Sequence, residues 1–222
     1  MKPAEHSVRW SALLRRLVVT GVVLGIWFWT QSLLGARTPP AAGGIGDALH
    51  NLTAGLNSYF EQNTTAANAL LIVSSVVVDA FGVFLLGSWL FGGSARPFLG
   101  LVLLMLLRQV LQALCSLPVP SGIIWHYPGF PSVLVTYHVA NDFFFSGHTA
   151  IAVLGSIELS RIHRKWLTVT SILLVLFEVA AVLVLRAHYT MDVFTGILAA
   201  LWVARISERI SPALDRRLAG SR

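Results

Sequence analysis

Apolar residues fill long blocks of this sequence, and short polar stretches that hold most of the charges separate the blocks. A helix needs about 20 apolar residues to cross the hydrocarbon of a bilayer. Six blocks approach that length: 17–36, 66–91, 97–117, 143–159, 166–185 and 188–206. The pattern therefore predicts an all-α polytopic membrane protein with six transmembrane helices.

The composition supports lipid as the solvent for much of the chain. Hydrophobic residues make up 55% of the 222 residues and charged residues only 12%, about half the usual charged share. So few charges cannot cover a soluble domain. The formal net charge is +6, but the basic residues lie just outside the apolar blocks, as membrane topology requires. We therefore expect no nucleic-acid partner.

Basic residues are concentrated in alternate loops. One set of loops and both termini contain Arg9, Arg15, Arg16, Arg96, Arg161, Arg164, Lys165, Arg205, Arg209, Arg216, Arg217 and Arg222. The opposite loops, 37–65, 118–142 and 186–188, hold only Arg37 and Arg186. The positive-inside rule then predicts that both termini are cytoplasmic. A cleaved signal peptide is the alternative for the first block, but its apolar core is longer than a normal signal core, which favours retention.

Two short motifs place histidines at the starts of predicted spans. Ser146-Gly147-His148-Thr149 opens the fourth span, and His188 to Asp192 opens the sixth. The histidines are 40 residues apart, enough for one helix across, a short turn and one helix back, since each leg covers about 30 Å. Both histidines should therefore lie at the same depth, on the non-cytoplasmic face.

The spacing of His188 and Asp192 suits nucleophilic catalysis. Residues at i and i+4 share a helix face, so the carboxylate can hold one imidazole N–H and raise the basicity of the other nitrogen. Such a nitrogen can attack phosphorus, and His148 can protonate the leaving oxygen. The helix starts favour a bound phosphate, and Gly147 would let it approach the backbone closely.

Structural explanations compete with this interpretation. A single interfacial histidine or an isolated His–Asp pair is usually not catalytic, but their joint placement in costly positions favours function. Two histidines and a carboxylate could also hold iron, yet nothing nearby forms an oxygenase pocket, so we expect no metal and no cofactor. Arg108, within the third span, could bind phosphate or pair with Asp79 or Glu178; both interpretations stay open.

The aromatic residues of the loop 118–142 also allow two interpretations. Trp125, Tyr127, Phe130 and Tyr137 could surround a quaternary ammonium headgroup through cation–π attraction. More often such residues form the aromatic belt at the membrane interface, and the belt is favoured here.

At the level of motifs, the chain resembles a known family. Asp142 to Thr149 and His188 to Val193 are similar to signatures of the sphingomyelin synthase branch of the type 2 phosphatidic acid phosphatase (PAP2) superfamily. Arg108 followed by Leu117-Pro118-Val119-Pro120 resembles another block of that branch. The resemblance implies a six-span helical fold, a phosphohistidine on His188, His148 as acid and Asp192 as orienter. It also makes Asp142 a member of the site.

Two features depart from the family pattern. Arg96-Pro97 lacks the upstream lysine of the superfamily's first motif, and residues 121–126 contain no acid where the synthase branch has one.

Together these observations predict three regions. A cytoplasmic segment spans 1–16, a six-span membrane domain spans 17–207 with its catalytic part within about 100–200, and a basic cytoplasmic tail spans 208–222. The predicted catalytic residues are His188, Asp192 and His148, and the predicted substrate-binding residues are Asp142, Ser146, Gly147 and Arg108.

The predicted activity acts on phospholipid headgroups through a phosphohistidine. It would move phosphocholine or phosphoethanolamine from a membrane phospholipid to a lipid alcohol, such as a diacylglycerol or a ceramide-like acceptor, or to water. A lipid phosphate phosphatase acting on phosphatidic acid is the main alternative. A transporter or a structural membrane subunit is less favoured, because we find neither the internal repeats of transporters nor another use for the paired histidines. The sequence leaves the oligomeric state open.

Overall fold

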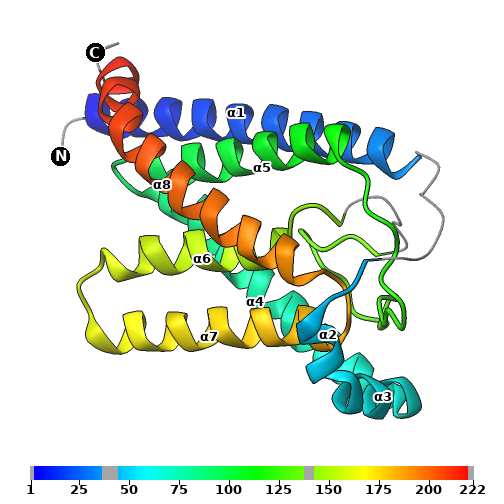
Figure 1. Cartoon of the computed structure of the whole chain (residues 1–222). Coiled ribbons are helices and arrows are strands. Elements are labelled where there is room, and N and C mark those ends of the chain that lie inside the picture. The colour runs from blue at the N-terminus through cyan, green and yellow to red at the C-terminus, as the bar shows by residue number, and fades with distance from the viewer. Residues whose placement is uncertain (1–2, 37–44, 138–142, 220–222) are drawn as a thin grey trace.

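The computed structural model describes residues 3–36, 45–137 and 143–219, and every regular element in these ranges is a helix (Figure 1). Five helices are long and apolar enough to cross a membrane. They are α1 (Pro3–Gly35), α4 (Thr64–Phe91), α5 (Arg96–Leu114), α7 (Lys165–Val184) and α8 (Thr190–Ala219). Three shorter helices complete the described fold: α2 (Ala48–Leu52), α3 (Ala54–Gln62) and α6 (Gly147–Ser160). An all-helical fold with several helices long and apolar enough to span a membrane is thus confirmed for the described residues, while the sixth crossing and the sidedness stay predictions.

The fourth predicted span is the short helix α6, which lies inside the bundle. It has 14 residues and is therefore about 21 Å long at 1.5 Å per residue. Ten of its residues are buried, because α4, α7 and α8 pack around it. The apolar residues Phe143 and Phe145, predicted to begin this span, are buried in the loop before the helix.

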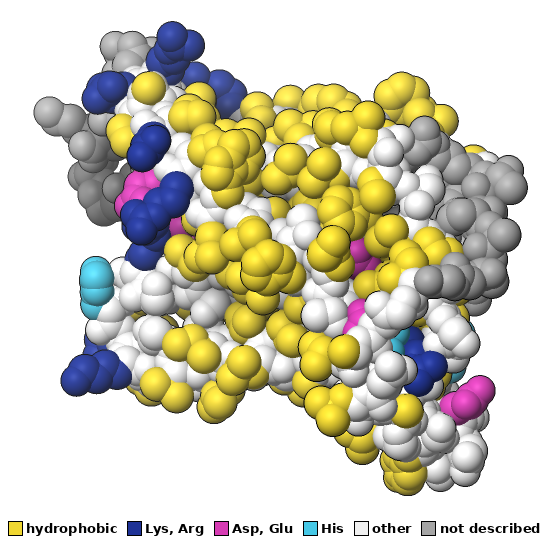
Figure 2. All heavy atoms as spheres, viewed as in Figure 1, with side chains coloured by type: hydrophobic (Ala, Val, Ile, Leu, Met, Phe, Trp, Pro, Cys, Tyr) yellow, Lys and Arg dark blue, Asp and Glu magenta, His cyan; other side chains and the backbone are white. Residues whose placement is uncertain are grey.

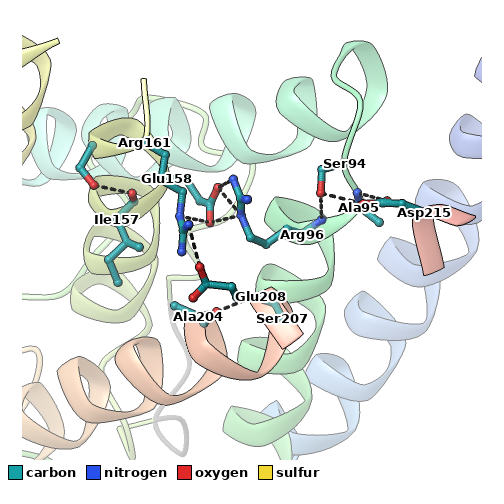
Figure 3. A network of polar contacts seen from close by, with 11 residues as sticks. Ser94, Ala95, Arg96, Ile157, Glu158, Arg161, Ala204, Ser207, Glu208 and Asp215 are labelled. Carbon is teal, nitrogen blue, oxygen red and sulfur yellow. Dashed lines mark hydrogen bonds and ion pairs between the residues drawn. The ribbon is translucent and has the colours of Figure 1, made fainter. Parts of the chain in front are cut away.

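The two terminal segments that the basic residues predict to be cytoplasmic, 1–16 and 208–222, are largely helical and continue α1 and α8. Helix α1 already begins at Pro3, and α8 runs through Pro212 to Ala219. The last turns of α8 are tied to the start of α5, since Asp215 accepts hydrogen bonds from the Ala95 backbone N–H at 2.7 Å and from the Ser94 hydroxyl at 3.0 Å (Figure 3).

An ion-pair network joins α5, α6 and α8 at the end where α1 begins. The Arg96 guanidinium donates to both carboxylate oxygens of Glu158, at 2.8 to 3.1 Å. Arg161 lies 3.4 Å from Glu158 and 3.1 Å from Glu208 (Figure 3). Lysine and arginine side chains gather at this end of the molecule (Figure 2). The charge asymmetry of the sequence is thus also an asymmetry in space, with α1 starting and α8 ending at the basic end (Figure 1).

Candidate active site at the starts of two helices

His188 lies in the turn between α7 and α8, two residues before α8 begins. The imidazole is buried, and its Nδ1 atom lies 2.8 Å from the carbonyl oxygen of Phe143. Because a carbonyl oxygen can only accept, Nδ1 carries the proton and donates it. The Nε2 atom of this tautomer keeps its lone pair, which is the form that a nucleophilic histidine requires.

Asp192 lies beside the His188 ring but is not hydrogen-bonded to it. Its Oδ2 atom is 3.8 Å from His188 Nδ1 and accepts the backbone N–H of Tyr189 at 2.9 Å. The side chain is fully buried. The direct carboxylate–imidazole bond expected from i, i+4 spacing is therefore absent in this structure. The reason is that His188 precedes the helix, where the spacing rule for helix faces does not apply.

His148 occupies the first turn of α6. Ser146 caps this helix by accepting the Thr149 backbone N–H at 3.3 Å. The Nε2 atom of His148 is buried and has no hydrogen-bond partner among the described residues. The Trp125 ring meets the imidazole edge to face, with ring centroids 5.1 Å apart. This histidine is therefore held by packing while one of its nitrogens is left available.

Direct contact between the starts of α6 and α8 explains why residues 40 apart meet. The Ser146 backbone N–H donates to the Asp192 carbonyl oxygen at 3.1 Å. At Gly196, one turn further along α8, an added Cβ would lie 2.8 Å from the Ser146 carbonyl oxygen. A glycine at this position lets the two backbones approach closely.

Both histidines line one pocket between α1, α4, α5, α6 and the loops. Its walls are formed by Trp27, Gln31, Val78, Met105, Arg108, Trp125, Leu134, Thr136, Phe143, Gly147, His148, Ile151, Ala187 and His188. Apolar side chains dominate the walls, and the polar groups are few. This is the usual character of a site that binds an organic ligand in a fixed orientation.

Arg108 brings positive charge to the start of α6. Its Nε donates to the Phe145 carbonyl oxygen at 3.0 Å, and an added Cβ at Gly147 would lie 3.2 Å from the same nitrogen. The carboxylates expected as alternative partners are engaged elsewhere: Asp79 accepts two backbone N–H groups of the loop, and Glu178 accepts the Ser74 hydroxyl. Arginine and a helix N-terminus together favour a phosphate.

The predicted site residues thus lie together, with two differences. His148, His188, Gly147 and Arg108 line the pocket. Ser146 and Asp192, in contrast, are fully buried and support the backbone around it. Asp142 lies outside the described residues. No group of three or more His, Cys, Asp and Glu side chains in the described ranges could hold a metal ion, so independence of metal stays a prediction.

The segment before α3 supplies contacts that sequence reasoning missed. Asp47 caps α2 and also accepts the backbone N–H and the hydroxyl of Thr190, both at 2.6 Å. His50 donates from Nε2 to the His188 carbonyl oxygen at 3.0 Å and stacks on Tyr189. These contacts fasten the turn that carries His188. The sequence could in principle have indicated Asp47 as the N-cap of the five-residue helix α2. It could not have indicated the contact with Thr190, which is 143 residues away in the chain.

The hydrogen bonds to Asp47 also perturb its ionisation. Burial alone raises the pKa of this carboxyl group, but the hydrogen bonds from Thr190 and from the His50 backbone outweigh that effect. The pKa of Asp47 therefore lies below its ordinary value, and the group is ionised at neutral pH.

The fold and the site define a multi-pass, all-helical membrane protein with two histidines and an arginine around one largely apolar pocket. The chain belongs to the AtPDCT1/2 family, whose family model matches residues 46–209. It is 23% identical over 193 residues to phosphatidylcholine:diacylglycerol cholinephosphotransferase 1 of Arabidopsis thaliana. That alignment covers 87% of this chain and 61% of the relative, so the chain spans about three fifths of the relative's length. No solved structure matches.

Proposed function

We propose that this protein is a lipid headgroup transferase that moves phosphocholine from phosphatidylcholine to a diacylglycerol. The observation that carries the proposal is the hydrogen bond between His188 Nδ1 and the Phe143 carbonyl oxygen, because it places the proton of the neutral ring on Nδ1 and so leaves the Nε2 lone pair for attack, on a residue that lines the pocket. The name of the Arabidopsis relative supplies the donor and the acceptor. Membership of the family supports the transfer of a lipid headgroup.

In the first step, His188 Nε2 attacks the phosphorus of the donor lipid. A nitrogen–phosphorus bond forms, and the bond from phosphorus to the glycerol oxygen breaks. His148 donates a proton to that oxygen, so a neutral diacylglycerol leaves. Arg108 and the N-terminal N–H groups of α6 offset the negative charge on the phosphoryl oxygens. The phosphocholine group is then held on His188.

The second step reverses the first with a different diacylglycerol. Its hydroxyl gives a proton to His148, its oxygen attacks phosphorus, and the bond to His188 breaks. Water could take the same place, so transfer requires a pocket in which the lipid alcohol outcompetes water. Apolar walls such as Val78, Met105 and Ile151 favour the alcohol.

In this proposal, the Asp192 carboxylate and the Phe143 backbone carbonyl act on His188 and not on the phosphorus. The Phe143 carbonyl oxygen fixes the tautomer, and the buried Asp192 carboxylate, 3.8 Å away, stabilises the positive charge that the ring gains when Nε2 bonds to phosphorus. The phosphohistidine is also what the resemblance to the sphingomyelin synthase branch of the PAP2 superfamily implies.

The test follows the headgroup between two lipid pools. Purified protein receives phosphatidylcholine labelled in its choline group, together with a diacylglycerol whose acyl chains differ from those of the donor. The expected result is labelled phosphatidylcholine with the new chains. His188→Ala should stop the transfer, whereas His163→Asn, in the exposed turn before α7, should not alter it.

Two outcomes would contradict the proposal and identify a different enzyme. Release of water-soluble labelled phosphocholine without new lipid would identify a phosphodiesterase. Fast release of inorganic phosphate from phosphatidic acid, with phosphatidylcholine and phosphatidylethanolamine untouched, would identify a lipid phosphate phosphatase.

A further inference from the structure

Helix α1 builds one wall of the pocket, although it lies outside the matched range 46–209. Three of its described side chains are buried: Thr20, Trp27 and Gln31. Their spacings of seven and four residues place them on one face of the helix. Thr20 accepts the indole N–H of Trp89 at 3.2 Å and so holds α1 against α4. Trp27 and Gln31, in contrast, line the pocket together with His148 and His188.

Trp27 carries a polar group that the described structure does not satisfy. Its indole N–H is buried and has no acceptor among the described residues. A buried donor left without an acceptor is unfavourable, and native proteins rarely leave one so. A phenylalanine would give an equally apolar wall without that cost. The indole N–H therefore indicates an acceptor oxygen on the ligand that fills the pocket.

Gln31 fixes the position of Trp27 relative to the rest of the site. Its Oε1 atom accepts a hydrogen bond from Gln109 Nε2 of α5 at 3.0 Å. Within a spanning helix, amide–amide hydrogen bonds of this kind hold neighbouring helices together. Trp27 lies one turn before Gln31, so this bond keeps Trp27 close to α5, the helix that also carries Arg108.

We infer that Trp27 donates its indole N–H to an acyl-ester carbonyl oxygen of the glycerolipid in the pocket. This subsite rests on the proposed function and specifies which part of the lipid α1 recognises. Arg108 and the start of α6 supply charge for the phosphate, whereas a neutral indole N–H suits a neutral carbonyl. The ester carbonyls of a glycerolipid lie only a few bonds from the oxygen that bears phosphorus. Trp27 thereby selects lipids with ester-linked chains.

The experiment compares two phosphatidylcholines of equal chain length on the full chain in detergent. One has two ester-linked chains, and the other has two ether-linked chains that lack the carbonyl oxygens. Binding is measured by the lipid-dependent rise in Tm, without any acceptor lipid. The unaltered protein should bind the diester lipid roughly three- to tenfold more tightly, the difference expected for one hydrogen bond. Trp27→Phe should bind both lipids equally, with the affinity that the unaltered protein has for the diether lipid.

Trp29→Phe is the matched control, because Trp29 is on the same helix and is 63% exposed. This variant should keep the preference for the diester lipid. Equal binding of the two lipids by the unaltered protein would overturn the inference, and this comparison needs no variant to fold. Persistence of the preference in Trp27→Phe would also overturn it.

The binding measurement and the transfer assay test the two proposals independently. A preference for the diester lipid that depends on Trp27, without any headgroup transfer, would support the subsite and contradict the proposed function. Headgroup transfer with no preference between the two lipids would support the proposed function and contradict the subsite.

Discussion

The proton on His188 Nδ1 is held by the backbone carbonyl oxygen of Phe143, 2.8 Å away and 45 residues earlier in the chain. A histidine nucleophile must present the right tautomer, and this hydrogen bond fixes it without a carboxylate. The tautomer therefore depends on the loop in front of α6 and not on the side chain of Asp192.

The first prediction follows for Asp192→Asn. Replacing the carboxylate of a catalytic triad reduces turnover about ten-thousandfold where the carboxylate sets the tautomer. Here the Phe143 carbonyl oxygen keeps the tautomer, so we expect a smaller loss of headgroup transfer, roughly tenfold to a hundredfold. His188→Ala should lose at least about a thousandfold. Initial rates of transfer in detergent measure both.

The double variant supplies the control for this prediction. Since Asp192 acts through His188 in the proposed mechanism, His188→Ala combined with Asp192→Asn should be no slower than His188→Ala alone. If Asp192→Asn is as inactive as His188→Ala while its Tm is unchanged, the carboxylate, and not Phe143, determines the state of the imidazole.

The second prediction concerns the contact between the starts of α6 and α8. A Cβ at Gly196 would lie 2.8 Å from the Ser146 carbonyl oxygen, so Gly196→Ala must push the two backbones apart. We expect a loss of about 1–3 kcal/mol in stability, as for other overpacked sites, together with reduced transfer. Thermal unfolding in detergent measures the first effect.

Gly87→Ala is the control for this steric argument. Gly87 also lies in a spanning helix, but nothing lies within 4 Å of its added Cβ. Its Tm should stay the same or rise slightly, because alanine favours a helix more than glycine does. Equal effects of the two substitutions would contradict the assignment of Gly196 to a close approach.

The third prediction concerns Asp47, which holds Thr190 with both carboxylate oxygens. Asparagine has one acceptor oxygen and cannot replace both contacts, so Asp47→Asn should lower stability by about 1–3 kcal/mol, as for a lost hydrogen bond to a charged group. It should also slow transfer, because the His188 turn loses its attachment. Ala48→Ser, at the exposed neighbouring position, is the matched control.

The pH dependence of this contribution has a definite sign. The folded pKa of Asp47 is lower than its ordinary value of 3.8. The stabilisation is therefore fully present above pH 3.8 and is lost as the pH falls through the lower folded value. In acid, the Tm difference between the unaltered protein and Asp47→Asn should shrink. A difference that is constant down to pH 3 would show that the charge of Asp47 plays no part.

The fourth prediction concerns sidedness. Single cysteines replace Val133, in the loop before α6, and Ile162, in the turn before α7, in a Cys115→Ala background. Both positions are exposed, by 60% and 48% respectively. The positive-inside rule predicts that an impermeant thiol reagent added to intact cells labels position 133 and not position 162. The reverse pattern would invert the orientation, and equal labelling would contradict the separation of these loops by a membrane.

The helices that face lipid could be predicted from sequence, and the inner helix could be predicted only in part. Helices α4 and α7 begin and end within about two residues of the expected spans, because lipid-facing helices are apolar at nearly every position. Before α6, Phe143 and Phe145 are equally apolar but belong to a buried loop. Ser146 is a typical N-cap residue, and the motif that it opens marks the start of α6 better than the apolar block does.

The residues of the candidate site could likewise be predicted only in part. His148 and His188 could be singled out as candidates because two ionisable groups near the ends of apolar blocks are unusual. The hydrogen bond from His188 to Phe143 could not be predicted, since every residue has a backbone carbonyl and the residue type does not indicate which one accepts. Trp27 could not be singled out either: it stands beside Phe28 and Trp29 in an apolar block, and only burial separates it from its neighbours.

The length of α6 has a consequence for where the chemistry takes place. Its last turn is fastened by Glu158 to Arg96 at the basic end, and its 14 residues extend about 21 Å from there. The hydrocarbon layer is about 30 Å thick, so the predicted topology, with the last turn of α6 at one boundary, leads us to expect its first turn roughly 9 Å short of the opposite boundary. This arrangement predicts that His148 lies beneath the headgroup layer. In the proposed reaction, a phospholipid would have to lower its phosphate to reach the histidines, whereas a diacylglycerol, which has no charged head, would already reside at that depth.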